Sequence, residues 1–343
     1  MKKKFLGLIV TALALSFLAG VGLAEKLLLI NGAGATFPYP LYSKWFYEYT
    51  KVDESVNFNY QSIGSGGGIR QITAQTVDFG ASDGAMTDEQ LKQAPGELFH
   101  IPMTAGAVVI TYNLPGVTER LKFSPEVVAD IFLGKISRWN DPRISKDNPG
   151  VNLPAENIIV AHRSDGSGTT NIFTDYLSSI SGIWKSRVGK GTAVDWPVGL
   201  GGKGNEGVAG LVKQTPGAVG YVELAYAVKN NLAYADIKNK SGNFITPSIE
   251  STTAAIEGKL NSMPEDFRVS LVNPDGADAY PIAGVTWILV YKNQTDKVKG
   301  KKIVEFLHWA LKDGQKYSAE LLYAPLPDAL IKKIEEKVDR ISY

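Results

Sequence analysis

The stretch IIVAHRSDGSGTTNIFTDYL (158–177) decides the fold class, because three kinds of segment follow one another in it. Residues 158–162 are apolar and partly β-branched, which predicts a buried strand. Residues 163–170 gather Gly, Ser, Thr and Asp, and the residues up to about 177 predict a helix. A helix N-terminus offers unpaired backbone N–H groups and the positive end of a dipole. The junction between strand and helix can therefore hold an anion.

The same sequence of strand, small polar loop and helix occurs three more times in the chain. The predicted strands and their loops are 26–30 with NGAGATFP (31–38), 57–61 with GSGGG (64–68), and 76–79 with GASD (80–83). Strands that alternate with helices predict an α/β protein with largely parallel sheets. Ligands in such sheets lie at the carboxyl ends of the strands, so we expect the four loops to share one anion site.

The rest of the chain continues the alternation with fewer polar junctions. The further predicted strands are 108–112 and 285–291, and the further helices are 125–134, 300–313 and 327–340. The glycine-rich stretch GLGGKGNEG (199–207) predicts a flexible loop.

Length and composition limit the possible functions. The chain has 343 residues, whereas a domain usually has about 100–200, so we expect two lobes. It has no cysteine and three histidines, which excludes disulfides and thiolate metal sites and argues against a metal centre. The formal net charge of +1 offers no basic field for nucleic acid.

Residues 1–24 have the pattern of a secretory signal peptide. Three lysines (2–4) precede an apolar run (5–18), and Gly22 and Ala24 are placed for cleavage before Glu25. An uncleaved membrane anchor is the alternative, since the apolar stretch extends to about 20 residues. Cleavage leaves 33 basic and 35 acidic residues, a net charge of −2. We expect a periplasmic protein that does not insert into a membrane once the signal is removed.

Three well-known motifs are incomplete in this sequence or lack the other residues that their function needs. Neither Gly32-x-Gly34 nor Gly166-x-Gly168 has the third glycine of a dinucleotide-binding loop, and the Gly202-Lys203 pair lacks the other residues of a P-loop. The stretch 80–84 matches G-x-S-x-G, the nucleophile motif of α/β hydrolases, with Ser82 as the nucleophile. A hydrolase needs a histidine base. His308 lies in the run IVEFLHWAL (303–311), which favours a packing role, and His100 and His162 have no evident orienting acid. A hydrolase is therefore the weaker alternative.

Several separated motifs together resemble the PstS-type periplasmic phosphate-binding proteins, the substrate-capture components of phosphate ABC importers. They are GAGATFP, GSGGG, VDFGASD (77–83), RSDGSGT (163–169), GLGGKGNEG, PGAVGYVELAYA (216–227) and LPDALI (326–331). The resemblance implies an α/β fold of two lobes with mixed, mostly parallel sheets and a ligand cleft between the lobes. Lobe I would take 25–103 and 284–343 and lobe II 104–283, with crossings near 103–108 and 281–286.

The resemblance also implies which residues contact phosphate. They are Thr36, Phe37, Ser65, Asp83, Arg163, Asp165, Ser167, Gly168 and Thr169. Asp83 would accept a hydrogen bond, and Asp165 would orient Arg163. Proteins of this family often have two serines where this chain has Ser65-Gly66, so only Ser65 is included.

The chemistry of the ligand supports a role for Asp83. Phosphate near neutral pH keeps a proton that a buried carboxylate can accept as a hydrogen bond, whereas sulfate has none. A site built around such a bond can reject the analogue that lacks it by about 10⁴–10⁵-fold. Arsenate also carries a proton and stays open as a ligand. We expect a monomeric, non-catalytic protein without a cofactor, whose partners are phosphate and the membrane permease.

Overall fold

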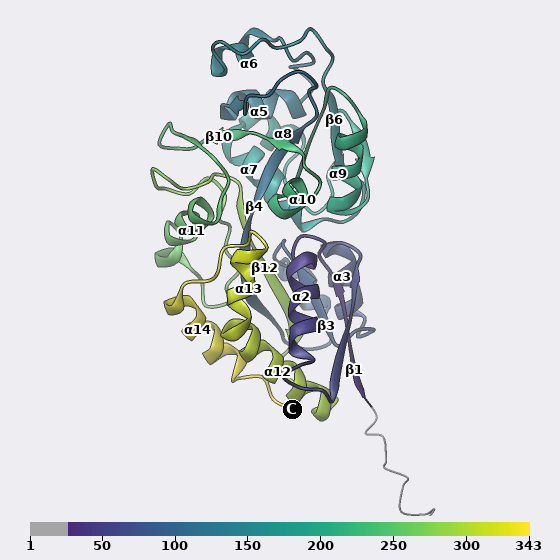
Figure 1. The fold of residues 1–343 in the computed structure, drawn as a ribbon. Helices are drawn as coiled ribbons and strands as arrows, with labels where there is room; N and C mark the ends of the chain where they lie inside the picture. Colours follow the sequence, from purple (N-terminus) through teal and green to yellow (C-terminus); the bar gives the residue numbers. More distant parts are fainter. Residues whose placement is uncertain (1–26) are drawn as a thin grey trace, which may run out of the picture.

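The computed structural model describes residues 27–343, so the predicted signal peptide (1–24) lies outside the described residues. Figure 1 shows an elongated molecule with an upper and a lower half, and strand β4 runs from one half into the other. Within residues 27–343, no helix is long and apolar enough to cross a membrane.

One nine-stranded sheet runs through both halves, in the order β2-β1-β3-β12-β4-β8-β6-β7, and β9 also pairs with β4. Strand β4 (Leu98–Tyr112) pairs with β12 (Ala283–Tyr291) as far as Ala107 and with β8 (Ala218–Glu223) from Val108 onward. These pairs are antiparallel, whereas β1 with β2 and β3, and β6 with β7 and β8, are parallel. The prediction of a mixed α/β sheet flanked by helices is confirmed.

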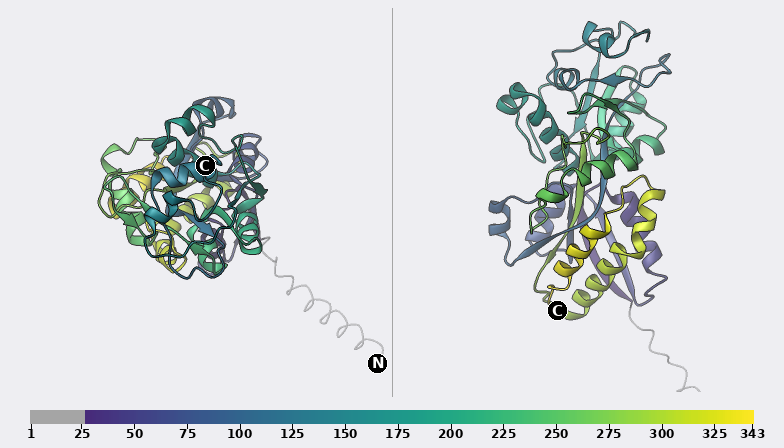
Figure 2. Two further views of the ribbon diagram at one scale, coloured as in Figure 1. Left: turned by 90° about the horizontal axis from the view of Figure 1, so that it is seen from above. Right: turned by 90° about the vertical axis from the view of Figure 1, so that its left-hand side faces the viewer.

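We call the part of the sheet before Val108 of β4, with its helices, the first half. It contains β1 (Leu28–Gly34), α2 (Tyr39–Tyr49), β2 (Val56–Ser62), α3 (Ser65–Thr73), β3 (Phe79–Ser82), α4 (Asp88–Gln93), β12, α12 (Lys297–Leu311), α13 (Lys316–Glu320) and α14 (Asp328–Val338). The right-hand view of Figure 2 shows the purple N-terminal elements and the yellow C-terminal helices together in this half.

The second half holds the middle of the chain. It contains β5 (Lys122–Phe123), α5 (Pro125–Phe132), α6 (Pro142–Asp147), β6 (Ile159–Arg163), α7 (Gly168–Ile180), α8 (Gly182–Arg187), β7 (Leu200–Gly202), α9 (Gly204–Gln214), β8, α10 (Leu224–Lys229), β9 (Ala233–Tyr234), β10 (Asp236–Lys238), β11 (Phe244–Ile245) and α11 (Ile249–Glu257). Strands β11, β10 and β5 form a separate small sheet.

Strand β4 is much longer than its predicted segment, residues 108–112. All 15 of its residues are buried, and the added part contains polar residues that hide its strand character in the sequence. The structure pairs these residues individually. The ring of His100 accepts a hydrogen bond from the N–H of Met86 at 3.0 Å, and the hydroxyl of Thr104 donates to the carbonyl of Ala324 at 3.0 Å.

Two glycine-rich stretches differ from their predictions. GSGGG was expected to precede a helix from residue 69, but α3 already begins at Ser65. A Cβ on Gly68 would lie 2.6 Å from Cα of Gly34, so glycine lets α3 approach β1 closely. The prediction of a flexible loop over residues 199–207 is wrong. It forms β7 and the start of α9, and Asn205 in it is fully buried.

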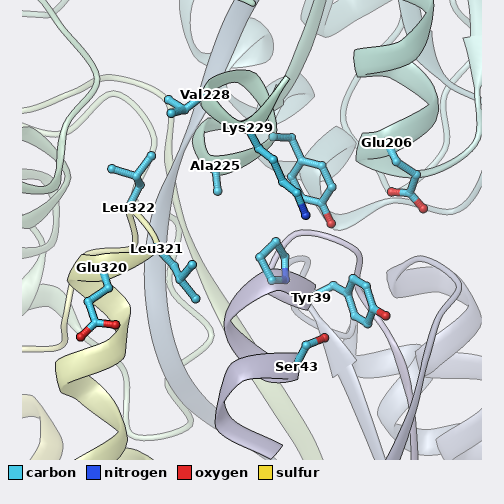
Figure 3. Close-up of a pocket in the computed structure, with 11 residues that line it drawn as sticks. Tyr39, Ser43, Glu206, Ala225, Val228, Lys229, Glu320, Leu321 and Leu322 are labelled. Atoms are coloured by element: carbon cyan, nitrogen blue, oxygen red, sulfur yellow. The ribbon is translucent and has the colours of Figure 1, made fainter. Parts of the chain in front are cut away.

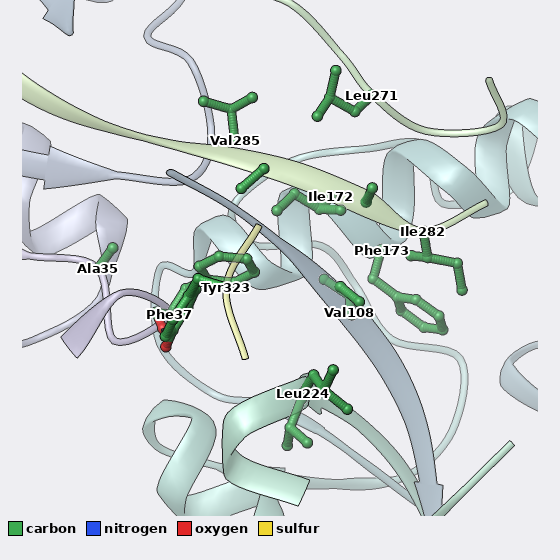
Figure 4. Close-up of a cluster of buried hydrophobic side chains, with 14 of the residues drawn as sticks. Ala35, Phe37, Val108, Ile172, Phe173, Leu224, Leu271, Ile282, Val285 and Tyr323 are labelled. Carbon is green, nitrogen blue, oxygen red and sulfur yellow. The ribbon is translucent and has the colours of Figure 1, made fainter. Parts of the chain in front are cut away.

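The apolar core continues across the boundary between the halves. Figure 4 shows Phe37 of the first half beside Tyr323, with Val108 of β4 and Leu224 of α10 nearby. The rings of Phe37 and Tyr323 lie 6.2 Å apart. The hydroxyl of Tyr323 lies 2.7 Å from the carbonyl oxygen of Phe37 and 3.2 Å from the carboxylate of Glu223, so it links the segment after β1 to the end of β8.

Candidate functional site

The polar junctions predicted after β1, β2, β3 and β6 meet where the two halves touch. The N–H of Gly66 in α3 donates to the carbonyl of Gly166 at 2.9 Å, which joins the first half to the second. A Cβ on Gly64 would collide with the carboxylate of Asp165, and Gly64 has a φ of +84°. Glycine therefore allows this contact both by its size and by its conformation.

Helix N-termini from both halves supply backbone N–H groups at this place. Thr36 and Phe37, just before α2, are buried, and within residues 27–343 neither N–H has a hydrogen-bond partner. Gly168 and Thr169 open α7, where first-turn N–H groups lack intrahelical partners. Buried N–H groups are nearly always paired, so this arrangement suits an anion.

Asp83 follows β3 and is almost completely buried, with 3% of its surface exposed. Its carboxylate accepts a hydrogen bond from the hydroxyl of Thr286 at 3.0 Å. Its other oxygen lies 3.4 Å from the hydroxyl of Ser65, which in turn accepts from the N–H of Asp83. Burial raises the pKa of Asp83 to about 7, although the Thr286 hydrogen bond and the charge of Arg163 oppose this rise. Asp83 is thus a buried carboxyl without a directly bonded cation.

Arg163 and Asp165 form a bidentate ion pair at the end of β6. The guanidinium donates to both carboxylate oxygens, at 2.7 and 2.6 Å, and Arg163 is buried. Burial alone would raise the pKa of Asp165, but the hydrogen bond and charge of Arg163 hold it below its ordinary value. The N–H of Gly204 also donates to Asp165 at 3.1 Å. The pair fixes the guanidinium plane and leaves its third nitrogen, Nη1, 3.4 Å from the hydroxyl of Thr169.

The hydroxyls of the predicted set differ in what they can still offer. The N–H of Ser167 donates to the carbonyl of Thr192 at 2.7 Å, so only its hydroxyl hydrogen is available. That hydroxyl caps α7 by accepting from the N–H of Thr170 at 3.0 Å. A Cβ on Gly168 would lie 2.5 Å from side-chain oxygens of both Asp83 and Ser65. The start of α7 in the second half therefore lies directly against these two residues of the first half.

Two polar residues at this place were missed from the sequence. Asn205 donates from its side chain to the hydroxyls of Thr36 and Thr169. The only sign of Asn205 in the sequence was its place in the motif GLGGKGNEG, which was interpreted as a flexible loop. Thr286, which contacts Asp83, is the one aliphatic hydroxyl in the apolar segment VTWILVY (285–291), and that interruption was its only mark in the sequence.

The parts of a serine hydrolase are not brought together. Ser82 is fully buried, and its hydroxyl donates to the carbonyl of Gly84. His100 is bonded to Met86, His162 stacks on Trp196 at 4.9 Å, and His308 pairs with Asp339 at 3.1 Å. Among residues 27–343, no group of three or more acidic or histidine side chains could hold a metal ion.

Two hollows lie along the line where the halves meet. One, of about 710 Å³, lies between α2, α10 and α13 and is lined by Tyr39, Val228 and Leu321 among others, as Figure 3 shows. Its mainly apolar lining does not suit a small dianion. The other, of about 450 Å³, reaches Asp83 and has Lys190 and Arg268 on its walls.

Comparison with known proteins gives a consistent result. Residues 22–313 match the family model described as "PBP superfamily domain". The "Phosphate-binding protein PstS" of Pasteurella multocida is 49% identical, and the alignment covers 89% of this chain and 88% of the relative. That of Xylella fastidiosa (strain 9a5c) is 47% identical over 90% and 85%.

A solved structure has the same fold at low sequence identity. It is a "high affinity periplasmic phosphate-binding protein" bound with phosphate, 20% identical, with a TM-score of 0.70. The match covers 92% of this chain and 99% of that chain.

Proposed function

Because the chain belongs to the periplasmic-binding-protein superfamily and, within it, to the PstS phosphate-binding proteins, we propose that it captures inorganic phosphate for an ABC importer. The observation that carries this proposal is the meeting of helix N-termini with Asp83, a buried carboxyl that bonds no cation. Capture and release need no catalytic step, so the protein is not an enzyme.

The two halves of the sheet are proposed as the two lobes. Lobe I takes residues 25–103 and 284–343, and lobe II takes 104–283. The change of partner along β4 at Ala107 and Val108 supports a crossing near 103–108, and β12 supports the other near 281–286. The touching loops suggest a closed form, and hinge opening would admit the ligand.

The phosphate would lie among the nine residues named from the sequence. Phe37 and Gly168 would donate backbone N–H groups, and Thr36, Ser65, Ser167 and Thr169 would donate hydroxyls. Arg163, held by Asp165, would supply the one guanidinium, which is suited to a tetrahedral oxyanion. Neutral dipoles and one compensated cation can hold a dianion without a large net charge.

Asp83 would accept the hydrogen bond of the protonated phosphate oxygen. A fully deprotonated anion such as sulfate offers Asp83 no proton and meets repulsion instead. Arsenate carries the same proton, so this device does not separate phosphate from arsenate. The hydroxyl of Ser82 is buried and donates to the carbonyl of Gly84, which argues against its role as the nucleophile of a hydrolase.

The location and the partner follow from the same family. With residues 1–24 as a signal peptide, the mature chain would act in the periplasm. It would deliver phosphate as a monomer to the permease subunits of the importer.

The experiment is a calorimetric titration of the mature protein, stripped of ligand, with phosphate at neutral pH. We expect saturable binding of one phosphate per chain. A folded, ligand-free protein that gives no binding heat and no shift of melting temperature with phosphate would contradict the proposal.

A further inference from the structure

Asn205 joins the two halves at the proposed site. It is fully buried at the start of α9, in the second half. Its backbone N–H donates to the hydroxyl oxygen of Thr36, in the first half, at 3.2 Å. Its side-chain amide donates to the same oxygen at 2.8 Å and to the hydroxyl oxygen of Thr169 at 3.1 Å. One residue therefore contacts two of the hydroxyls proposed to bind phosphate.

The orientation of the Asn205 amide is fixed by its other end. The amide oxygen accepts a hydrogen bond from the backbone N–H of Glu223, at the end of β8, at 2.9 Å. A flipped amide would place its NH₂ against that N–H and its oxygen toward the threonines. The strand end therefore ensures that NH₂ faces the two hydroxyls.

A hydroxyl oxygen has two lone pairs and one hydrogen. On Thr36 both lone pairs are used by Asn205, through its backbone and its side chain. On Thr169 one is used by Asn205 and the other faces Nη1 of Arg163 at 3.4 Å. Each hydroxyl can then only donate a hydrogen bond, and neither can accept one from a P–O–H group of the ligand.

We propose that Asn205 is a positioning residue that makes the hydroxyls of Thr36 and Thr169 obligate donors. It acts on Thr169 within the second half, and on Thr36 only when the two halves meet. This inference rests on the proposed function. Among the nine residues proposed to contact phosphate, Asp83 is then the acceptor left for a ligand proton, so the site favours phosphate with one proton over phosphate with two. A second P–O–H group would face donors and remain unpaired, which is costly in a buried site.

The test is the pH dependence of phosphate affinity in the full mature protein and in Asn205→Ala. At about pH 7.5 the variant should bind phosphate at least about tenfold more weakly, because two donors lose their orientation. At about pH 5.5, where phosphate carries two protons, the freed hydroxyls can accept. The ratio of the two dissociation constants should then shrink at least about threefold.

A matched control separates positioning from general loss of structure. Asn239 is also buried in the second half, and its amide donates to the carbonyls of Gly276, Ala277 and Ala279. Asn239→Ala should lower the melting temperature but leave phosphate affinity and its pH profile unchanged.

A double-mutant cycle keeps the proposal testable if Asn205→Ala proves unstable. In a protein with Thr36→Val and Thr169→Val, the milder Asn205→Ser should weaken phosphate binding less than about twofold, since its targets are gone. A ratio independent of pH, or an undiminished effect in that background, would overturn the role of Asn205. Absence of phosphate binding by the wild-type protein would instead overturn the proposed function.

Discussion

Asp83 and Asp165 are the same residue type on opposite sides of one site, yet their environments differ. Asp83, in the first half, is bonded to neutral hydroxyls, and burial raises its pKa to about 7. Asp165, in the second half, is bonded twice to Arg163, which holds its pKa below the ordinary value. A carboxyl held by a cation has little need of a ligand proton. Asp83, which bonds no cation, is suited to accept a hydrogen bond from the ligand proton. The comparison therefore assigns ligand recognition to Asp83 and the positioning of Arg163 to Asp165.

The largest expected effect is that of Asp83→Asn on phosphate binding. The amide keeps the shape but its NH₂ can donate where the ligand also donates, so phosphate affinity at neutral pH should fall about 100-fold. Equilibrium dialysis with labelled phosphate measures this. Asp130→Asn, which removes a surface partner of Arg143, is the control and should bind as the wild type does. Unchanged affinity of Asp83→Asn would show that Asp83 does not recognise the ligand proton.

The two carboxyls should also give opposite pH dependences of stability in the ligand-free protein. The pKa of Asp83 in the folded state, about 7, lies above the ordinary 3.8, so the native state loses stability as pH rises between these values. Asp83→Asn cannot ionise, and its free energy of unfolding relative to wild type should rise by about 1–3 kcal/mol from pH 4 to pH 7.

Asp165 has the reverse sign. Its lowered pKa adds stability above its ordinary range, and this stability is lost as pH falls through the folded-state pKa. Asp165→Asn should therefore be most destabilised, relative to wild type, at neutral pH, and the difference should shrink on acidification. Urea unfolding at several pH values measures both slopes, and slopes of equal sign would break the comparison.

A smaller effect is expected of Asp165→Asn on phosphate affinity. Arg163 keeps its charge, and the amide oxygen can still accept one of its two hydrogen bonds. The dissociation constant should rise less than about tenfold. Calorimetry alongside Asp83→Asn gives the contrast, and a loss larger than that of Asp83→Asn would reverse the assignment of roles.

The smallest effect is expected of Ser82→Ala. The hydroxyl is buried and bonded within its own turn to Gly84, so its removal should leave phosphate affinity within about twofold of wild type. A loss of binding comparable to that of Asp83→Asn would place Ser82 in the site.

The sequence predicted the parts of the fold that depend on local pattern. Residues 158–177 contain a strand, a loop and a helix as expected, because an apolar run and the N-cap Ser167 are visible locally. The first ten residues of β4 were missed because His100 and Thr104 are paired with distant backbone groups. GSGGG was not recognised as the start of a helix. Its glycines are explained by the close approach of Gly68 to Gly34, which is a tertiary contact.

The candidate site could be predicted where residue type and resemblance agreed. Asp83 and Arg163 were named, and the structure brings them to one place. Asn205 was missed because its role depends on contacts with Thr36, 169 residues away, and with Glu223. Such contacts arise only when β1, α9 and β8 are assembled.

The most direct test of the central claim, that one cation-free carboxyl recognises the ligand proton, is phosphate binding in a large excess of sulfate. Calorimetric titrations of the wild type, Asp83→Asn and Asp165→Asn are compared with and without sulfate. We predict that sulfate leaves the phosphate isotherm of the wild type and of Asp165→Asn unchanged, and that it competes in Asp83→Asn. Sulfate competition with the wild type, or none in Asp83→Asn despite measurable phosphate binding, would contradict the account.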